Sequence, residues 1–122
     1  MTYQIRILFL ISLSLVFYLS LVPSSDIPRF ASLSFLSDKV VHALIYFYLG
    51  YIGLLCSFKI KKEVIICLVF GFGLIIEIIH YYHPFRFFEY LDLLANLIGV
   101  TIALLIFRIK NNISYWFIFF SP

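Results

Sequence analysis

The stretch from Glu77 to Gly99, EIIHYYHPFRFFEYLDLLANLIG, decides the fold of this chain. Two apolar segments flank a short polar turn at Pro84, which predicts the end of one membrane span and the start of the next. Several of the few ionisable residues are gathered here, whereas most other positions are Leu, Ile, Phe, Tyr or Val. An ionisable side chain within a membrane span is costly unless it has a partner, so such residues are candidates for function. We therefore expect the rest of the chain to supply those partners.

Composition points to an integral membrane protein. The chain has 122 residues, of which 64% are hydrophobic and 12% are charged. A soluble domain is normally about 45–50% apolar and about 25% charged. The length allows one membrane domain, residues 1–122, and no separate soluble domain. The two cysteines, Cys56 and Cys67, have neither a metal-binding nor a redox spacing and are interpreted as small apolar residues.

Hydropathy predicts four membrane spans, each close to the length of about 20 residues that crosses about 30 Å of hydrocarbon. The spans are residues 5–22, 40–58, 64–83 and 91–107, and residues 108–122 are predicted to form an interfacial tail. The first span could instead be a cleaved signal peptide, but its apolar run exceeds the usual core of about 7–15 residues and no A-x-A site follows it. The expected fold is an all-α membrane bundle of four transmembrane helices.

The distribution of Lys and Arg predicts the orientation of this bundle. With four spans, the amino end, the loop 59–63 and the tail lie on one side, and this side holds Arg6, Lys59, Lys61, Lys62, Arg108 and Lys110. The other side holds Arg29, Lys39 and Arg86. Short loops rich in Lys and Arg stay in the cytoplasm, so both termini are predicted to be cytoplasmic. The short loop 59–63 predicts an antiparallel hairpin of the second and third spans.

This topology brings polar residues from three spans to the same outer end. Residues three or four apart share a helix face, and at a rise of 1.5 Å per residue Glu77 lies roughly 9 Å below Pro84. His42 and Asn96 lie about one turn inside their own spans. We therefore predict a polar pocket that opens outward. Its predicted ligand-binding residues are Lys39, His42, Glu77, Arg86, Asp92 and Asn96.

Each of these residues also has a structural explanation. Glu77 could pair with a cation and fix how the helices associate, and Asp92 could stabilise the start of the fourth helix. Asn96 could form a hydrogen bond between helices, while Lys39 and Arg86 could be interfacial anchors. The convergence of all these residues on one end of the bundle favours the functional interpretation.

The same residues carry a resemblance to a known family. The chain resembles the VanZ-like membrane proteins, the family named for a teicoplanin-resistance protein, whose pattern runs D-K-x-x-H-x-x-x-Y, E-x-x-Q, P-x-R and D-x-x-x-N-x-x-G. The matching segments are Asp38-Lys39-Val40-Val41-His42 with Tyr46 and Gly50, Glu77 with Pro84-Phe85-Arg86, and Asp92-Leu-Leu-Ala-Asn96-Leu-Ile-Gly99. The match covers about residues 38–106, more than half of the chain. His80 stands where the family usually has Gln, and Glu89 stands where a small or polar residue is common.

The resemblance implies a multi-pass protein of the bacterial cytoplasmic membrane, in a family some of whose members lower susceptibility to glycopeptide antibiotics. It implies no settled reaction, so two functions stay open. In the first, Lys39 and Arg86 bind the phosphate of an anionic membrane lipid or a lipid-linked cell-wall precursor, and Asp92, Asn96 and Glu77 position these cations. In the second, a membrane-embedded hydrolase or transferase acts on a lipid-linked phosphate. Its catalytic candidates are His42 or Glu77 as general base and Asp92, which orients the histidine.

Other partners are less favoured. A metal site of His42, Glu77, His80 and Asp92 would rest on a single Glu-x-x-His motif, and a residue usually replaced by Gln is a poor obligatory ligand. A haem bound by two histidines would need them to face each other at the same depth. We therefore expect no metal, no other cofactor and no nucleic acid. A proton-coupled transporter built on Glu77 would be possible only as an oligomer, because four short spans enclose little space, and a homo-oligomer stays open.

Overall fold

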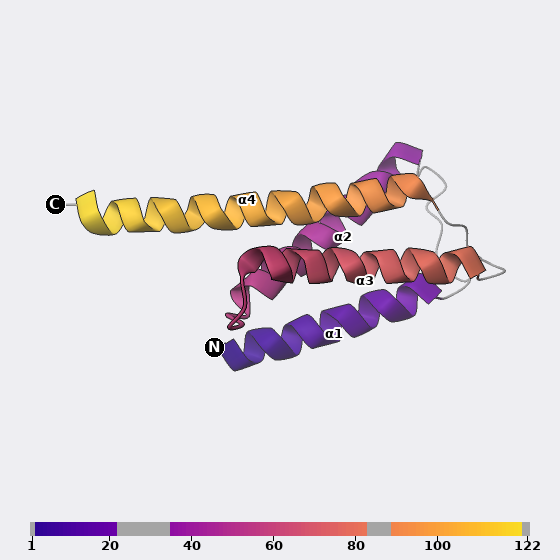
Figure 1. The fold of residues 1–122 in the computed structure, drawn as a ribbon, viewed down its shortest axis with the longest axis horizontal. Helices are drawn as coiled ribbons and strands as arrows, with labels where there is room; N and C mark the ends of the chain where they lie inside the picture. The colour runs from indigo at the N-terminus through magenta and orange to yellow at the C-terminus, as the bar shows by residue number, and fades with distance from the viewer. Residues whose placement is uncertain (1, 22–34, 83–88, 121–122) are drawn as a thin grey trace.

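The described part of the chain is a bundle of four α-helices (Figure 1). The computed structural model describes residues 2–21, 35–82 and 89–120. The helices are α1 (Thr2–Leu21), α2 (Phe35–Leu55), α3 (Lys62–Tyr82) and α4 (Tyr90–Phe120). All four are long and apolar enough to cross a membrane, and the described residues contain no strand. This confirms the predicted all-α, four-helix membrane fold, while the cytoplasmic location of the termini stays a prediction.

The helical form follows from the membrane environment, where each backbone N–H and C=O must find its partner within the protein. Where α2 ends, the carbonyl oxygens of the loop between α2 and α3 accept hydrogen bonds from a side chain of α1. Arg6 donates hydrogen bonds to the carbonyl oxygens of Cys56 (3.0 Å) and Ser57 (3.2 Å). Ser57 itself has a φ of 55°, a left-handed conformation that ends many helices. One arginine thus caps α2 and fixes α1 against the loop.

The most extensive helix contact joins α2 and α4, and it is closest at Gly99. A Cβ atom at Gly99 would clash with the carbonyl oxygen of Ala43 and would lie 2.9 Å from the backbone nitrogen of Phe47. The backbones of the two helices therefore touch, which small residues permit in membrane bundles. Gly71 differs, because a Cβ atom there would meet nothing within 4 Å.

The buried core lies between the helices, and Tyr46, Leu49 and Val100 are among its best-buried side chains. Many large apolar side chains point outward instead, on all four helices. A soluble monomer rarely exposes so much contiguous apolar surface. This surface is therefore the one that faces lipid.

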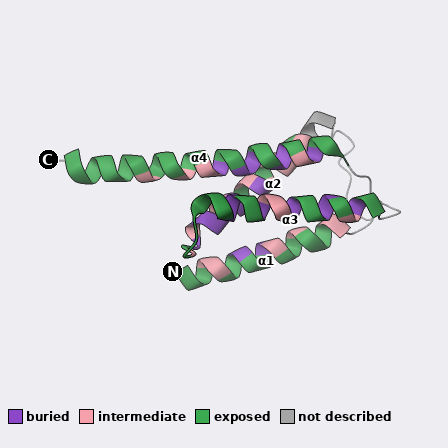
Figure 2. Ribbon diagram, in the orientation of Figure 1, coloured by how far each residue is buried: buried purple, intermediate pink, exposed green. Residues whose placement is uncertain are grey.

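α4 continues beyond the predicted span 91–107, because residues 108–120 form part of the same helix. Figure 2 shows that buried residues of α4 are confined to the part beside the other helices, while its carboxyl-terminal part is exposed. Arg108 and Lys110 follow the predicted span directly, but charged residues can end a span without ending a helix. The aromatic side chains of Tyr115 and Trp116 are exposed, and the interfacial position of this segment stays a prediction.

We expect Gly99→Ala to destabilise the bundle by about 1–3 kcal/mol, because the added methyl group must push apart two helix backbones rather than a flexible side chain. The measurement is the midpoint of thermal unfolding of the detergent-solubilised protein. Gly71→Ala is the matched control and should leave this midpoint unchanged or raise it. An equal fall of the unfolding midpoint in both variants would show that the close contact between α2 and α4 at Gly99 does not stabilise the bundle.

Candidate functional site

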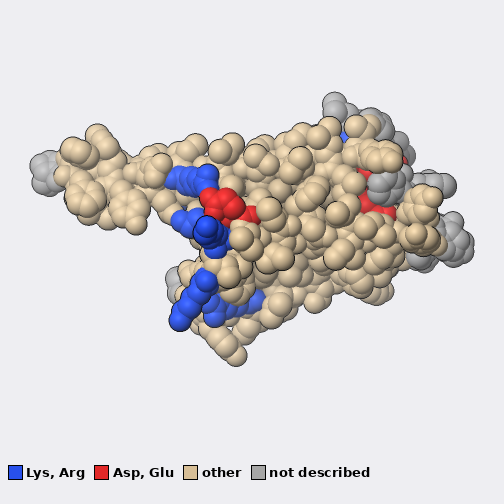
Figure 3. All heavy atoms as spheres, in the orientation of Figure 1, with Lys and Arg blue, Asp and Glu red and all other residues tan. Residues whose placement is uncertain are grey.

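Charged side chains form two groups at opposite ends of the bundle, separated by uncharged surface (Figure 3). One of these groups lies where α2 and α4 begin and where α3 ends. We call Lys39 and its neighbours Asp38, His42, Glu89 and Asp92 the Lys39 cluster. It joins the first turns of α2 to the start of α4.

Lys39 is the centre of this cluster. Its ammonium nitrogen contacts the carboxylates of Glu89 and Asp92 and lies 3.1 Å from Oδ2 of Asp38. The side chains of Lys39 and Asp92 are only 11% and 9% exposed, whereas those of Asp38 and Glu89 are about half exposed. A buried charge that loses its partner is strongly destabilising. Lys39 and Asp92 therefore depend on each other, and the two outer carboxylates remain hydrated.

Asp92 also connects Lys39 with His42, because its two oxygens face different partners. Oδ1 contacts Lys39, while Oδ2 lies 3.7 Å from Nε2 of His42. The same imidazole nitrogen lies 3.9 Å from Oδ1 of Asp38, one helical turn before it. These distances exceed a hydrogen bond but allow strong attraction once the imidazole is protonated. His42 therefore lies between two carboxylates, one from its own helix and one from α4.

A second pair, Glu77 and His80, lies deeper in the bundle and is almost fully buried. Nε2 of His80 lies 2.7 Å from the carbonyl oxygen of Ser20 on α1, so this nitrogen must donate the hydrogen bond. Nδ1 of His80 lies 3.5 Å from Oε1 of Glu77, one helical turn earlier on α3. Oε2 of Glu77 accepts a long hydrogen bond (3.4 Å) from the backbone N–H of Glu89. The pair thus holds α1, α3 and the start of α4 together.

Asn96 lies in the interior between three helices and has an unpaired acceptor. Its residue is 1% exposed, and its Oδ1 has no hydrogen-bond partner among the described residues. A Cβ atom on Gly73 would lie 2.8 Å from Nδ2 of Asn96 and 2.8 Å from Cε1 of Tyr46, so α3 packs directly on both. An unsatisfied buried acceptor costs about 1–3 kcal/mol. Oδ1 of Asn96 is therefore available to a donor from water or from a ligand.

The structure places five of the six predicted ligand-binding residues in this half of the bundle: Lys39, His42, Glu77, Asp92 and Asn96. Arg86, the sixth, lies outside the described residues. Lys39, His42 and Asp92 are in one cluster, whereas Glu77 pairs with His80 and Oδ1 of Asn96 bonds to neither group. That these residues bind a ligand stays a prediction.

Two contacts were not predicted from the sequence. Glu89, which stands where a small or polar residue is common in the family, contacts Lys39. The carbonyl oxygen of Glu89 also accepts a hydrogen bond from the backbone N–H of Asp92 (3.2 Å). The turn that starts α4 therefore positions the carboxylates of both Glu89 and Asp92. The spacing of three residues between the two acids was the signal that could have indicated this. The bond from His80 to Ser20 had no sequence signal, because any backbone carbonyl can serve as acceptor.

The arrangement could hold a cation other than lysine only by displacing it. Asp38, His42 and Asp92 each offer one atom, and these atoms lie within 4.8 Å of one another. The ammonium group of Lys39 already contacts both carboxylates. The less favoured metal set of His42, Glu77, His80 and Asp92 is split, because His80 lies against Glu77 and bonds to α1. Lysine thus takes the position that a metal would need.

The chain is similar to known proteins along most of its length. The VanZ/LLP1 family model matches residues 4–111. An uncharacterised protein of Schizosaccharomyces pombe is 28% identical over 109 residues, which is 84% of this chain and 62% of that protein. The chain therefore spans less than two thirds of that relative. No solved structure matches significantly.

We expect Lys39→Met to lower the free energy of unfolding by about 3–5 kcal/mol, because Asp92 is left buried without its cation. The double variant Lys39→Met with Asp92→Leu should recover most of this loss, since an apolar pair fills the same space without a charge. Thermal unfolding of the wild type, both single variants and the double variant gives the coupling between the residues.

Glu89→Gln is the matched control for this cycle. Its carboxylate is 45% exposed, and an exposed ion pair contributes only about 0–1 kcal/mol. Effects of Lys39→Met and Asp92→Leu that simply add would contradict the mutual dependence of the two residues.

Proposed function

Because the chain belongs to the VanZ/LLP1 family, we propose that it is a cell-envelope membrane protein whose Lys39 cluster binds the headgroup of a lipid. The chain is a multi-pass membrane protein, with four helices able to span the bilayer. We assign it to the bacterial cytoplasmic membrane with both termini inside. Six Lys and Arg residues on the side of the termini, against three on the other side, support this orientation.

One observation carries the proposal: Lys39 is buried against three carboxylates near the end of a membrane bundle. Moving charges out of water costs several kcal/mol, and an apolar pair of similar size is often at least as stable. A purely structural contact between α2 and α4 therefore does not require these charges. Ionisable residues kept in a membrane protein despite this cost are functional candidates.

The charge of the cluster restricts the chemistry of the ligand. One ammonium faces the carboxylates of Asp38, Glu89 and Asp92, so a ligand with only negative charge would be repelled. A headgroup that carries a phosphate and also amine or hydroxyl donors suits the cluster better. Its phosphate would meet Lys39 together with Arg86, which lies outside the described residues, and its donors would meet the carboxylates. Oδ1 of Asn96 could accept a further donor.

Two kinds of lipid have this chemistry: an amine-bearing phospholipid and a lipid-linked cell-wall precursor. The similar protein in Schizosaccharomyces pombe supports a ligand that bacteria and yeasts share. We therefore favour the phospholipid headgroup and treat the precursor as the alternative ligand of the same cluster.

A second candidate function is an enzyme that acts on a lipid-linked phosphate, as a hydrolase or transferase. The distance of 3.7 Å between Nε2 of His42 and Oδ2 of Asp92 favours it, because a carboxylate beside an imidazole can orient a general base. Glu77 is the weaker candidate for this base, since His80 and the backbone of Glu89 already engage both of its oxygens.

We expect the protein to bind phosphatidylethanolamine at least about tenfold more tightly than phosphatidylcholine with the same acyl chains, because only the former has N–H donors for charged hydrogen bonds. Native mass spectrometry of the full chain in detergent measures both affinities. Asp92→Asn should remove most of the preference, whereas Glu63→Gln, the same kind of change at the other end of the bundle, should keep it.

Equal binding of the two lipids, or an equal loss in Glu63→Gln, would contradict the headgroup proposal. A polyprenyl-linked sugar diphosphate that binds more tightly than either would identify the precursor as the ligand. The same incubations are analysed for released headgroup or phosphate. Product made by the wild type and not by His42→Ala would favour the enzyme.

We further expect expression of the chain in a sensitive bacterium to raise the minimal inhibitory concentration of teicoplanin, and Glu77→Gln to abolish this effect. Glu77 pairs with His80 between three helices, so its loss should disturb the site without removing the span. Glu63→Gln is again the control, and a membrane blot verifies equal expression. Protection by Glu77→Gln equal to that of the wild type would separate resistance from the polar residues.

A further inference from the structure

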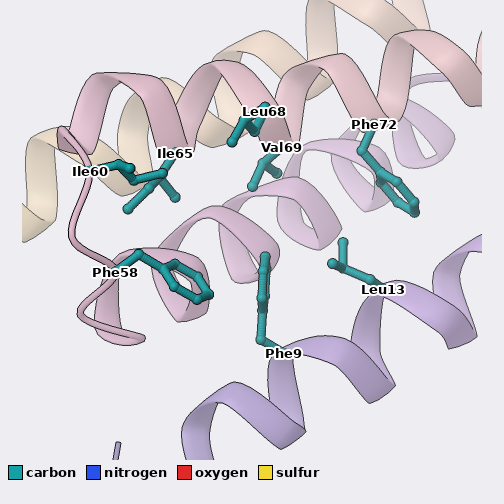
Figure 4. A pocket seen from close by; sticks show the side chains of 8 residues that line it. All are labelled: Phe9, Leu13, Phe58, Ile60, Ile65, Leu68, Val69 and Phe72. Atoms are coloured by element: carbon teal, nitrogen blue, oxygen red, sulfur yellow. The ribbon is translucent and has the colours of Figure 1, made fainter.

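An apolar pocket of about 430 Å³ lies at the end of the bundle opposite the Lys39 cluster. Figure 4 shows the side chains that line it: Phe9 and Leu13 from α1, Phe58 and Ile60 from the loop, and Ile65, Leu68, Val69 and Phe72 from α3. All eight lining side chains are hydrocarbon. Its volume lies within the range of roughly 300–1,000 Å³ typical of small-molecule sites. The lining offers no side chain that hydrogen-bonds, so the occupant must be apolar at this point.

The lining of the pocket extends along α3, and part of it is exposed. From Ile65 to Phe72 the wall extends over two turns of α3, about 10 Å at 1.5 Å per residue. Phe9 and Ile65 are buried, while Leu68 is 62% exposed and Ile60 is 46% exposed. The opening therefore faces the lipid surface of the bundle. A section of an acyl chain that runs parallel to the helices has the matching shape.

Positive charge lies at the loop end of this pocket, where a lipid headgroup would be. Lys59 and Lys61 directly flank the lining residue Ile60 in the chain, and both are exposed. Within the described ranges, no carboxylate forms an ion pair with either of them. Arg6 bonds to the loop carbonyls and Lys62 lies over the ring of Phe107, so these two cations are engaged in packing. Figure 3 shows the basic group gathered at this end.

We propose that this pocket is a binding site for an anionic phospholipid of the leaflet next to the basic loop. One acyl chain occupies the apolar pocket, and the headgroup phosphate meets Lys59 and Lys61. Clusters of Lys and Arg at a membrane surface attract anionic lipids. The adjoining pocket adds a specific contact for the acyl chain of one bound lipid. The site is distinct from the Lys39 cluster in position and in ligand charge, so it goes beyond the proposed function.

The test compares phosphatidylglycerol with phosphatidylcholine of the same acyl chains, bound to the full chain in detergent and measured by native mass spectrometry. The wild type should retain phosphatidylglycerol preferentially. Lys59→Gln and Lys61→Gln should each weaken its binding roughly fivefold, the effect of one basic residue near the lipid surface. Lys110→Gln removes the same charge from α4 and should leave binding unchanged.

A second pair of variants tests the pocket itself. Leu13→Trp fills the pocket and should abolish the preference for phosphatidylglycerol, whereas Leu15→Trp, on an exposed position of the same helix, should retain it. Equal binding of both lipids, an equal effect of Lys110→Gln, or normal binding by Leu13→Trp would overturn the proposal. A lipid-free dimer that Leu13→Trp dissociates would assign the pocket to a second copy of the chain instead. The preference for phosphatidylethanolamine is measured in parallel, so failure at one site is separable from failure at the other.

Discussion

The backbone contact between α2 and α4 is the constraint on which the polar end of the molecule depends. A Cβ atom at Gly99 would clash with the carbonyl oxygen of Ala43, so nothing larger than glycine fits without a shift of one helix. Lys39 lies one turn before Ala43, and Asp92 lies two turns before Gly99. The contact therefore sets the register in which Lys39 reaches Asp92. The close packing at Gly99 and the ion pair between Lys39 and Asp92 join the same two helices. Each contact holds the helices in the position that the other contact requires.

The number of helices and the gathering of polar residues at one end could be predicted from the sequence, because both follow from apolar length and the order of the spans. The pairing between individual side chains could not be predicted from the sequence. Whether Lys39 meets Glu89 depends on how far α2 is rotated about its axis, which spacing does not determine. His80 bonds to the backbone of Ser20, and a carbonyl acceptor has no residue signature. Arg108 indicated where a span ends but not where its helix ends.

Among the described residues, the two ends of the bundle differ in the sign of their charge and in how far that charge is exposed. At one end, carboxylates outnumber the lysine that they surround, and the charges are partly buried. At the other, lysines of the loop 59–63 are exposed and stand beside an apolar pocket. A small protein with one fold thus presents different chemistry to each membrane surface. The first suits a ligand with hydrogen-bond donors, and the second suits negative charge.

The unequal length of the helices has a consequence for the membrane around them. α1, α2 and α3 have 20 or 21 residues, about 30 Å at 1.5 Å per residue. α4 has 31 residues, about 46 Å on the same scale. α4 therefore extends beyond the other three helices, and in a bilayer matched to those three its last turns lie outside the hydrocarbon unless α4 tilts or the lipid deforms. Membrane thickness thus determines how much of the long helix lies in lipid and how much lies in water.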